Sequence, residues 1–92
     1  MAVDAYFKEL EKIIKGFANH RRLQILDLLR REPWLSIDNM CEKLNIGYHN
    51  ASDHVRKMSI AGLVVKRNEG VVVKHKLTPL AESILVFCKK LK

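Results

Sequence analysis

The sequence has few of the residues that hold small proteins together by covalent bonds or metal ions. Its two cysteines, Cys41 and Cys88, lie far apart and form no Cys-x-x-Cys pair. This spacing offers neither a zinc clip nor a disulfide framework, so we expect ordinary buried thiols. We also expect no resident metal and no other cofactor.

Long apolar runs and linker-like segments are missing as well. The apolar runs are far shorter than the roughly 20 residues of a membrane span. The start, Met1–Tyr6, lacks the basic and apolar regions of a secretory signal, and no repeat or Pro/Gly/Ser-rich stretch divides the chain. We therefore expect residues 1–92 to form one soluble domain, located in the cytoplasm and not attached to a membrane.

Acidic residues are scarce in only one half of the chain. Residues 1–42 hold seven Lys and Arg against seven Asp and Glu, whereas residues 43–92 hold ten against three. The whole net charge of +7 therefore comes from the second half. Positive charge concentrated in one half of the chain favours a polyanionic partner that binds at one face.

Apolar residues recur at helical spacing in four segments of the first two thirds of the chain. They predict helices over residues 3–15, 19–31, 36–44 and 48–61. Gly16 is expected to interrupt the chain after the first helix, and Gly62 to end the fourth. The short turn Asn45-Ile46-Gly47 makes residues 36–61 a helix-turn-helix.

Two β-branched runs follow the predicted helix-turn-helix. Leu63–Arg67 and Val71–Leu77 are separated by Asn68-Glu69-Gly70, where Gly supplies the positive φ of a hairpin turn. We therefore assign residues 63–77 to a hairpin wing, and Thr78-Pro79 opens a last helix over residues 80–91. The predicted fold class is mostly α with a small β-hairpin wing, a winged helix-turn-helix.

The predicted fourth helix carries a polar face that admits three interpretations. Ala51, Val55 and Met58 should pack inward, which leaves much of the stretch HNASDH, His49 to His54, pointing outward. His49 and Asp53 are i, i+4 neighbours able to hold a metal, but two ligands are too few for a zinc site. Simple solvation of the helix is the second interpretation.

The third interpretation, which we favour, is contact with double-stranded DNA. A helix with short polar side chains in its first turns can enter the major groove, where Asn reads adenine and Asp accepts from cytosine. The candidates for reading bases are Tyr48, His49, Asn50 and Asp53. The candidates for holding phosphates from this helix and the wing are Ser52, Arg56, Lys57, Lys66, Arg67, Lys74 and Lys76. Strand alternation favours Lys74 and Lys76 among the wing residues.

Three stretches of the sequence carry a family resemblance. FANHRRLQILDLL is similar to the opening Leu-Ala-Asp-x-x-Arg-x-x-Ile-Leu-x-x-Leu of the ArsR/SmtB-type winged-helix repressors, and LSIDNMCEKLNI and HNASDHVRKMSIAGLVVKRNEGVVVKHKL follow in the family's order. The resemblance covers nearly all of residues 10–80. It implies a homodimer that binds an inverted-repeat operator and represses transcription. His54 matches a His common in this family's reading helix, with packing or a phosphate contact as its simplest role.

The residues themselves support the dimer only through the terminal helices, 3–15 and 80–91. Each has an apolar stripe wider than a small core can easily absorb. The interface candidates are Tyr6, Phe7, Leu10, Ile84, Phe87 and Leu91. The alternative is that these side chains belong to the core of the single chain.

Departures from the family pattern concern its sensing sites. Metal-sensing members carry Cys-x-Cys at the start of the third helix, where this chain has Ser36 and Asp38. The terminal helix offers only Glu82 and Cys88 where others place Asp and His, so sensing of the known metals is not expected. Some members sense redox or sulfur species through paired cysteines, and Cys41 with Cys88 could imitate such a pair.

Asp53 departs from the family pattern too, because a carboxylate near phosphates costs binding energy. We expect it either to accept from a cytosine amine or to pair with His49 or Lys57. Pairing with His49 would keep that imidazole partly protonated near neutrality. DNA affinity would then vary between about pH 5 and 8.

The favoured function is a sequence-specific DNA-binding transcriptional regulator, most simply a repressor, whose inducer is unknown. The alternative is a winged helix used for protein interaction or for non-specific DNA binding. Trp34 could then anchor a partner, although covering the core between the second and third helices is its simpler role. An enzyme is not expected, since the sequence has no metal quartet, glycine-rich loop or nucleophile–base pair.

Overall fold

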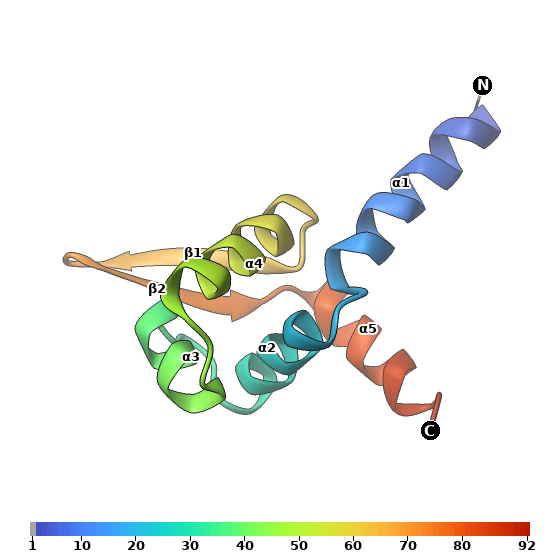
Figure 1. Cartoon of the computed structure of the whole chain (residues 1–92). Coiled ribbons are helices and arrows are strands. Elements are labelled where there is room, and N and C mark those ends of the chain that lie inside the picture. The colour runs from blue at the N-terminus through green and yellow to red at the C-terminus, as the bar shows by residue number, and fades with distance from the viewer. Residues whose placement is uncertain (1) are drawn as a thin grey trace.

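The computed structural model describes residues 2–92, which form five helices and one two-stranded antiparallel sheet (Figure 1). The elements in chain order are α1 (Ala2–Phe17), α2 (His20–Arg31), α3 (Ile37–Leu44), α4 (Tyr48–Ile60), β1 (Val64–Glu69), β2 (Val72–Leu77) and α5 (Pro79–Lys89). The predicted fold class, a mostly helical winged helix-turn-helix, is confirmed. No helix in the described part combines the length and apolar character needed to cross a membrane.

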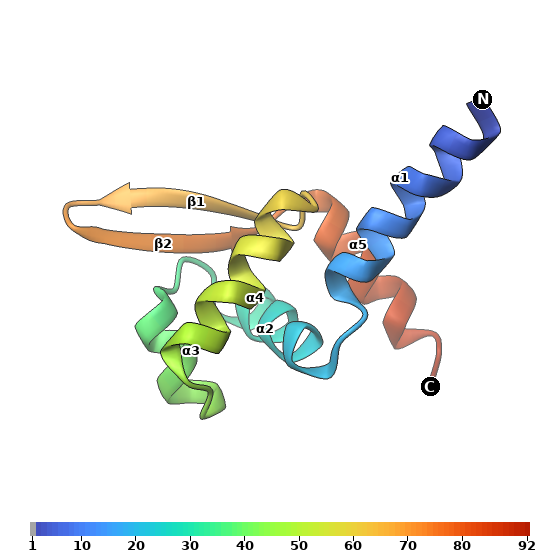
Figure 2. The ribbon, with the colours of Figure 1, turned by 45° about the horizontal axis from the view of Figure 1, so that its top comes forward.

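The core is built around α2, which lies between α3 on one side and α5 on the other (Figures 1 and 2). Its Leu and Ile residues repeat closely enough to bury a wide face. The buried side chains of α2 are Ile25, Leu26, Leu28 and Leu29. Those packed with them from the other elements are Met40, Ile46, Ala51, Val55, Met58, Leu63, Val64, Leu77, Ala81 and Ile84.

The helix-turn-helix is set by local sequence. Ser36 caps α3 with a capping box, in which its side chain accepts from Asn39 N–H and the Asn39 side chain accepts from Ser36 N–H. The helix ends at Asn45 in the left-handed region, with φ 55°. Ile46 is buried behind the turn, and Gly47 precedes α4. The turn therefore orients α4 across α3, as the sequence predicted.

Gly16 plays a different role from the one that the sequence suggested. We expected it to interrupt the chain, but α1 continues through it to Phe17. A Cβ at this position would lie 2.6 Å from the Ala61 Cβ at the end of α4, which is closer than such atoms approach. Gly16 is therefore the place where α1 packs against α4, and a larger side chain would push the two helices apart.

The wing is a hairpin whose turn lies later in the chain than predicted. The strands pair from Val64 with Leu77 to Glu69 with Val72, which leaves a two-residue turn, Gly70-Val71. Gly70 has φ 66°, so the glycine does supply the positive φ. Asn68 and Glu69, expected in the turn, belong to β1. A two-residue turn keeps the twist of the strands and lengthens the paired ladder.

The connection between α2 and α3 docks the wing onto the body. Trp34 N–H donates to His75 O at 2.8 Å, and His75 N–H donates to Leu35 O at 2.9 Å. These bonds make Leu35 an isolated bridge partner of β2. Trp34 has φ 66°, which turns the chain after Pro33 so that it runs beside the strand. The expected place of Trp34 between the second and third helices was wrong, because this turn carries its ring to the wing.

Candidate nucleic-acid interface

The face of α4 opposite the core lies open to solvent. Ala51, Val55 and Met58 are buried, as their spacing predicted. Tyr48, His49 and Asn50 in the first turn are exposed, and Ser52 is half-buried on the flank of the helix. The first turn of α4 therefore presents three polar side chains that nothing in the described chain covers.

Asp53 lies at the centre of an ion-pair cluster on this face. Its carboxylate accepts from Arg56 Nη2 at 2.8 Å and contacts Lys57 Nζ at 3.1 Å. These two hydrogen-bonded cations lower the pKa of Asp53. The expected pair with Lys57 is confirmed, and Arg56 is a second partner that was not predicted. No bond joins Asp53 to His49, so the hypothesis of a His49 pair was wrong.

His54 turns inward and joins three helices through Arg22. Arg22 Nε donates to His54 Nδ1 at 3.0 Å, while its Nη1 donates to the Lys15 carbonyl at 3.0 Å. His54 accepts in this bond, so its Nδ1 carries no proton. Burial, and then the Arg22 charge, lower the pKa of His54. His54 thus packs between the helices, in agreement with the first of its two expected roles. The bond to Arg22 joins residues far apart in the chain, so the sequence did not predict it.

The basic residues of the wing divide between its two faces. Lys66 projects on the same face as His75, its partner across the hairpin, while Arg67, Lys74 and Lys76 lie on the other face. Alternation thus placed Lys74 and Lys76 together, as predicted. Glu69 forms ion pairs with Arg67 and, at 3.3 Å, with Lys74. These two cations lower the pKa of Glu69.

Trp34 supports the basic face of the wing. The Arg67 guanidinium lies 3.8 Å from the ring centroid of Trp34, and Lys76 Nζ lies 5.6 Å from it. Such cation–π contacts hold both side chains over the indole. Arg67 is thus occupied by Trp34 and Glu69 together. Within residues 2–92, Lys66 and Lys76 make no ion pair and keep their charge available.

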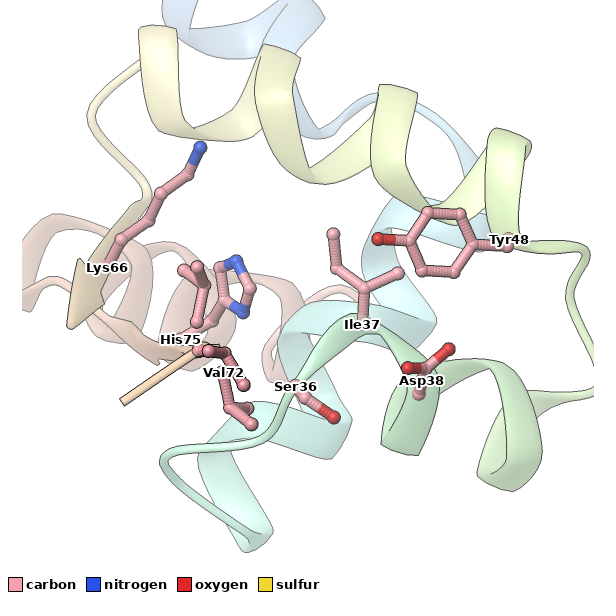
Figure 3. Close-up of a pocket in the computed structure, with 9 residues that line it drawn as sticks. Ser36, Ile37, Asp38, Tyr48, Lys66, Val72 and His75 are labelled. Carbon is pink, nitrogen blue, oxygen red and sulfur yellow. The ribbon is translucent and has the colours of Figure 1, made fainter. Parts of the chain in front are cut away.

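A cleft of about 500 Å³ separates the wing from the helix-turn-helix (Figure 3). Lys66 from β1 and Tyr48 from α4 reach toward it from different sides, and His75 and Ile37 line its floor. His75 is only 1% exposed, and its Nδ1 donates to Leu35 O at 2.9 Å. Burial lowers the pKa of His75. A neutral, buried histidine therefore supports the base of the wing.

The residues considered for metals or redox chemistry do not come together. No group of three His, Cys, Asp or Glu side chains among residues 2–92 is placed to hold a metal ion. Ser36 caps α3 instead. Cys41 on α3 and Cys88 on α5 are free, half-buried thiols, and these helices lie on opposite sides of α2 (Figure 1). Burial raises the pKa of Cys41. A redox pair within one chain is therefore not supported, since a disulfide needs Cα atoms within about 7 Å.

The two ends of the chain expose apolar side chains, which we call the terminal surface. It comprises Val3, Tyr6, Phe7 and Ile14 from α1, and Leu80, Val86, Phe87 and Leu91 at α5. Tyr6 and Phe7 meet edge to face with centroids 5.3 Å apart. Leu10 is half-buried. Ile84, an interface candidate by sequence, is instead buried in the core, because its place on α5 faces α2.

The sequence matches no protein-family model and no curated protein. Its fold recurs in solved structures of other proteins. One is the homodimeric winged helix-turn-helix DNA-binding domain Mb0332 from Mycobacterium bovis, a possible ArsR-family transcriptional regulator. It has 24% sequence identity to this chain and a TM-score of 0.87, and the match covers 96% of this chain and 82% of that chain. The transcriptional regulator HlyU from Vibrio vulnificus shares the fold with 27% identity and a TM-score of 0.77, over 98% of this chain and 94% of that chain. The transcriptional repressor PagR of Bacillus anthracis shares it with 19% identity and a TM-score of 0.80, over 91% of this chain and 97% of that chain. These structures confirm the winged helix-turn-helix fold that the resemblance to the ArsR/SmtB-type repressors implied.

Proposed function

We propose that this protein is a homodimeric regulator of transcription, a repressor that binds an inverted-repeat operator in double-stranded DNA. The observation that carries the proposal is the uncovered polar first turn of α4, held by a helix-turn-helix beside a basic wing. The DNA-binding domain Mb0332 and the repressor PagR, which share the fold, support it.

In the proposed complex, α4 enters the major groove with its first turn foremost. Tyr48, His49 and Asn50 then meet base edges, and Asn50 can form two hydrogen bonds with an adenine. Arg56 and Lys57 partly neutralise Asp53, which reduces the cost of bringing a carboxylate near phosphates. Asp53 keeps acceptor sites for a cytosine amine, while Arg56 and Lys57 stay exposed for phosphates. Ser52, on the flank, adds a hydroxyl donor.

The wing supplies the second group of phosphate contacts. Lys76 and Lys66 carry charges that no carboxylate of the described chain neutralises. Arg67 and Lys74 share Glu69 and contribute less. Because Trp34 holds Arg67 and Lys76 in place, less side-chain entropy is lost when the backbone of the DNA arrives. The wing is thus prepared for binding before the DNA is present.

The terminal surface is the proposed dimer interface. Tyr6 and Phe7 are 60% and 59% exposed, and Phe87 is 57% exposed, although all three are large and apolar. The N-terminal half of α1 projects away from the body (Figure 1). Exposed apolar surface of this kind marks an interaction site, and Mb0332, which shares the fold, is homodimeric. A second copy would bury these side chains and present two α4 helices to one duplex.

The experiment that tests the proposal is selection of bound duplexes from a random DNA pool, with the protein's mass in solution measured in parallel. A dimer that enriches an inverted repeat with half-site centres about 34 Å apart, one turn of B-DNA, is the expected result. If no sequence is enriched and the protein binds all duplexes alike with an affinity that falls as salt rises, the function is non-specific DNA binding. Absence of any binding would favour the protein-interaction module instead.

A further inference from the structure

A groove of about 410 Å³ lies where α1 meets the start of α2 and the end of α4. Its floor is apolar and consists of Gly16, Ile60 and Ala61. The groove exists because Gly16 has no side chain, so the helices meet closely below it while the longer side chains stand around it. It lies outside the residues assigned to base reading and outside the wing.

Ile60 gives the groove an unusual apolar wall. It occupies the last turn of α4 and is 76% exposed, although an isoleucine gains free energy by leaving water. It is also separate from the terminal surface, since it belongs to α4. A ligand with an apolar body would cover Ile60 and Ala61 together.

Four cations surround this floor and come from three helices. They are Lys12 and Lys15 from α1, Arg22 from α2 and Lys57 from α4. Among residues 2–92, carboxylates pair with two of the four: Glu11 with Lys15 at 3.0 Å and Asp53 with Lys57 at 3.1 Å. The groove therefore has an excess of positive charge.

Arg22 offers the groove a half-buried donor group. Its Nε and Nη1 are engaged by His54 Nδ1 and by the Lys15 carbonyl. These bonds orient the guanidinium, and Nη2 donates to no atom within residues 2–92. An oriented guanidinium with a remaining donor suits a carboxylate, which accepts charge-assisted hydrogen bonds.

We propose that this groove binds a small amphipathic organic carboxylate. The carboxylate lies against Arg22 and Lys12, and its aliphatic or aromatic body covers Ile60 and Ala61. A volume of about 410 Å³ falls in the range of small-molecule sites, which combine an apolar lining with a few convergent polar groups. The site borders the proposed DNA-binding surface, because Lys57 lines the groove and is also a proposed phosphate contact. Arg22 connects the groove to α4 through His54, so the ligand contacts the helix that carries the base-reading candidates.

Binding can be tested with three probes on the full chain, followed by amide shifts in ¹H–¹⁵N NMR spectra. The probes are 4-phenylbutyrate, the uncharged 4-phenylbutan-1-ol of the same shape, and acetate, which has the charge without the body. We expect saturable shifts at Gly16 and Ala61 with 4-phenylbutyrate, and at least about tenfold weaker binding of the other two, because each lacks half of the recognised chemistry. Equal binding of the alcohol or of acetate would overturn the proposal, as would shifts at Tyr6, Phe7 and Phe87 only.

Substitutions of exposed side chains test the same site without disturbing the core. Lys12→Gln should weaken 4-phenylbutyrate binding about two- to fivefold, as expected for one exposed ion pair, and Ile60→Ser should weaken it comparably. The matched controls, Lys8→Gln on α1 and Val71→Ser at the fully exposed wing tip, should change nothing. If the controls weaken binding as much, or if a short duplex shifts the groove residues while 4-phenylbutyrate does not, the groove is no carboxylate site.

Discussion

The two ends of this small molecule expose opposite chemistry. Around α4 and the wing, the exposed charged groups are mostly basic, and Asp53 and Glu69 each organise two neighbouring cations. Around α1 and α5, large aromatic side chains such as Phe7 and Phe87 are exposed beside the charged ones. The first surface suits a hydrated polyanion and the second suits an apolar partner. The two proposed partners, DNA and a second copy of the chain, would therefore bind separate parts of the same fold.

The largest effect should come from placing charge in the terminal surface. Phe7→Asp with Phe87→Asp is expected to raise the dimer dissociation constant at least about a hundredfold, because large aromatic anchors dominate interfaces. Both side chains are more than half exposed, so the monomer should stay folded. Sedimentation equilibrium measures the dissociation constant, and circular dichroism checks the fold. A dimer of unchanged affinity would show that the copies meet elsewhere.

The next effect concerns the exposed first turn of α4, which we propose reads bases. Asn50→Ala should weaken binding to the selected operator about ten- to a hundredfold and relax the preference at one base pair, as the loss of one two-bond contact to adenine does. The terminal surface is untouched, so the dimer should persist. Fluorescence anisotropy with operator variants at that position measures both effects. If the substitution lowers the affinity for operator and random DNA equally, Asn50 contacts a phosphate instead of a base.

Acid should first loosen the part of the molecule that contains α4 and the wing. Burial, with a nearby cation, lowers the pKa of both His54 and His75. The folded state therefore binds fewer protons than the unfolded state. The stability that the two neutral histidines contribute is fully present above about pH 6.5, the usual pKa of histidine. It is lost as the pH falls from there toward the lowered pKa values of the folded state. Asp27, Asp53 and Glu69 titrate lower still, because ion pairs lower their pKa values.

Urea unfolding at pH 7.5, 6.5 and 5.5, with hydrogen exchange of wing and α5 amides, measures this loss. His54→Gln keeps an acceptor for Arg22 but cannot be protonated, so its midpoint should fall less with acidification than that of the wild type. The wing should lose protection before α5, which carries no histidine. If the midpoints of the two proteins fall equally with acidification, protonation of His54 is not a cause of the lost stability.

The smallest effect separates two neighbouring lysines of the wing. Lys76→Ala should reduce the slope of log affinity against log salt by about one, and weaken binding to all duplexes alike. Lys74→Ala should reduce it by less, because Lys74 shares its charge with Glu69 in the free protein. Anisotropy titrations between 50 and 200 mM salt, roughly the range where counterion release is well measured, distinguish the two. Equal slopes would mean that DNA displaces Glu69 from Lys74.

Local patterns carried much of the prediction. The positions of the five helices, the capping residue Ser36 and the buried face of α4 followed from spacing and from residues that act on their neighbours in the chain. The pair between Asp53 and Lys57 was foreseen for the same reason, because i, i+4 residues face each other on a helix. The wing was foreseen as a hairpin, and only its turn was misplaced.

Contacts between distant residues were decided by the tertiary structure. Gly16 reads as a helix breaker in sequence, yet packing against Ala61 makes it part of α1. Trp34 and Arg67 are far apart in the chain, and only the strand-like docking of Leu35 on β2 brings them together. Ile84 reads as one more residue of an apolar stripe, and only the placement of α5 against α2 buries it. The sequence by itself determined the elements and their polar and apolar faces, since these depend on neighbours within a few residues. Which faces meet one another, and which stay open to a partner, depended on how the helices pack.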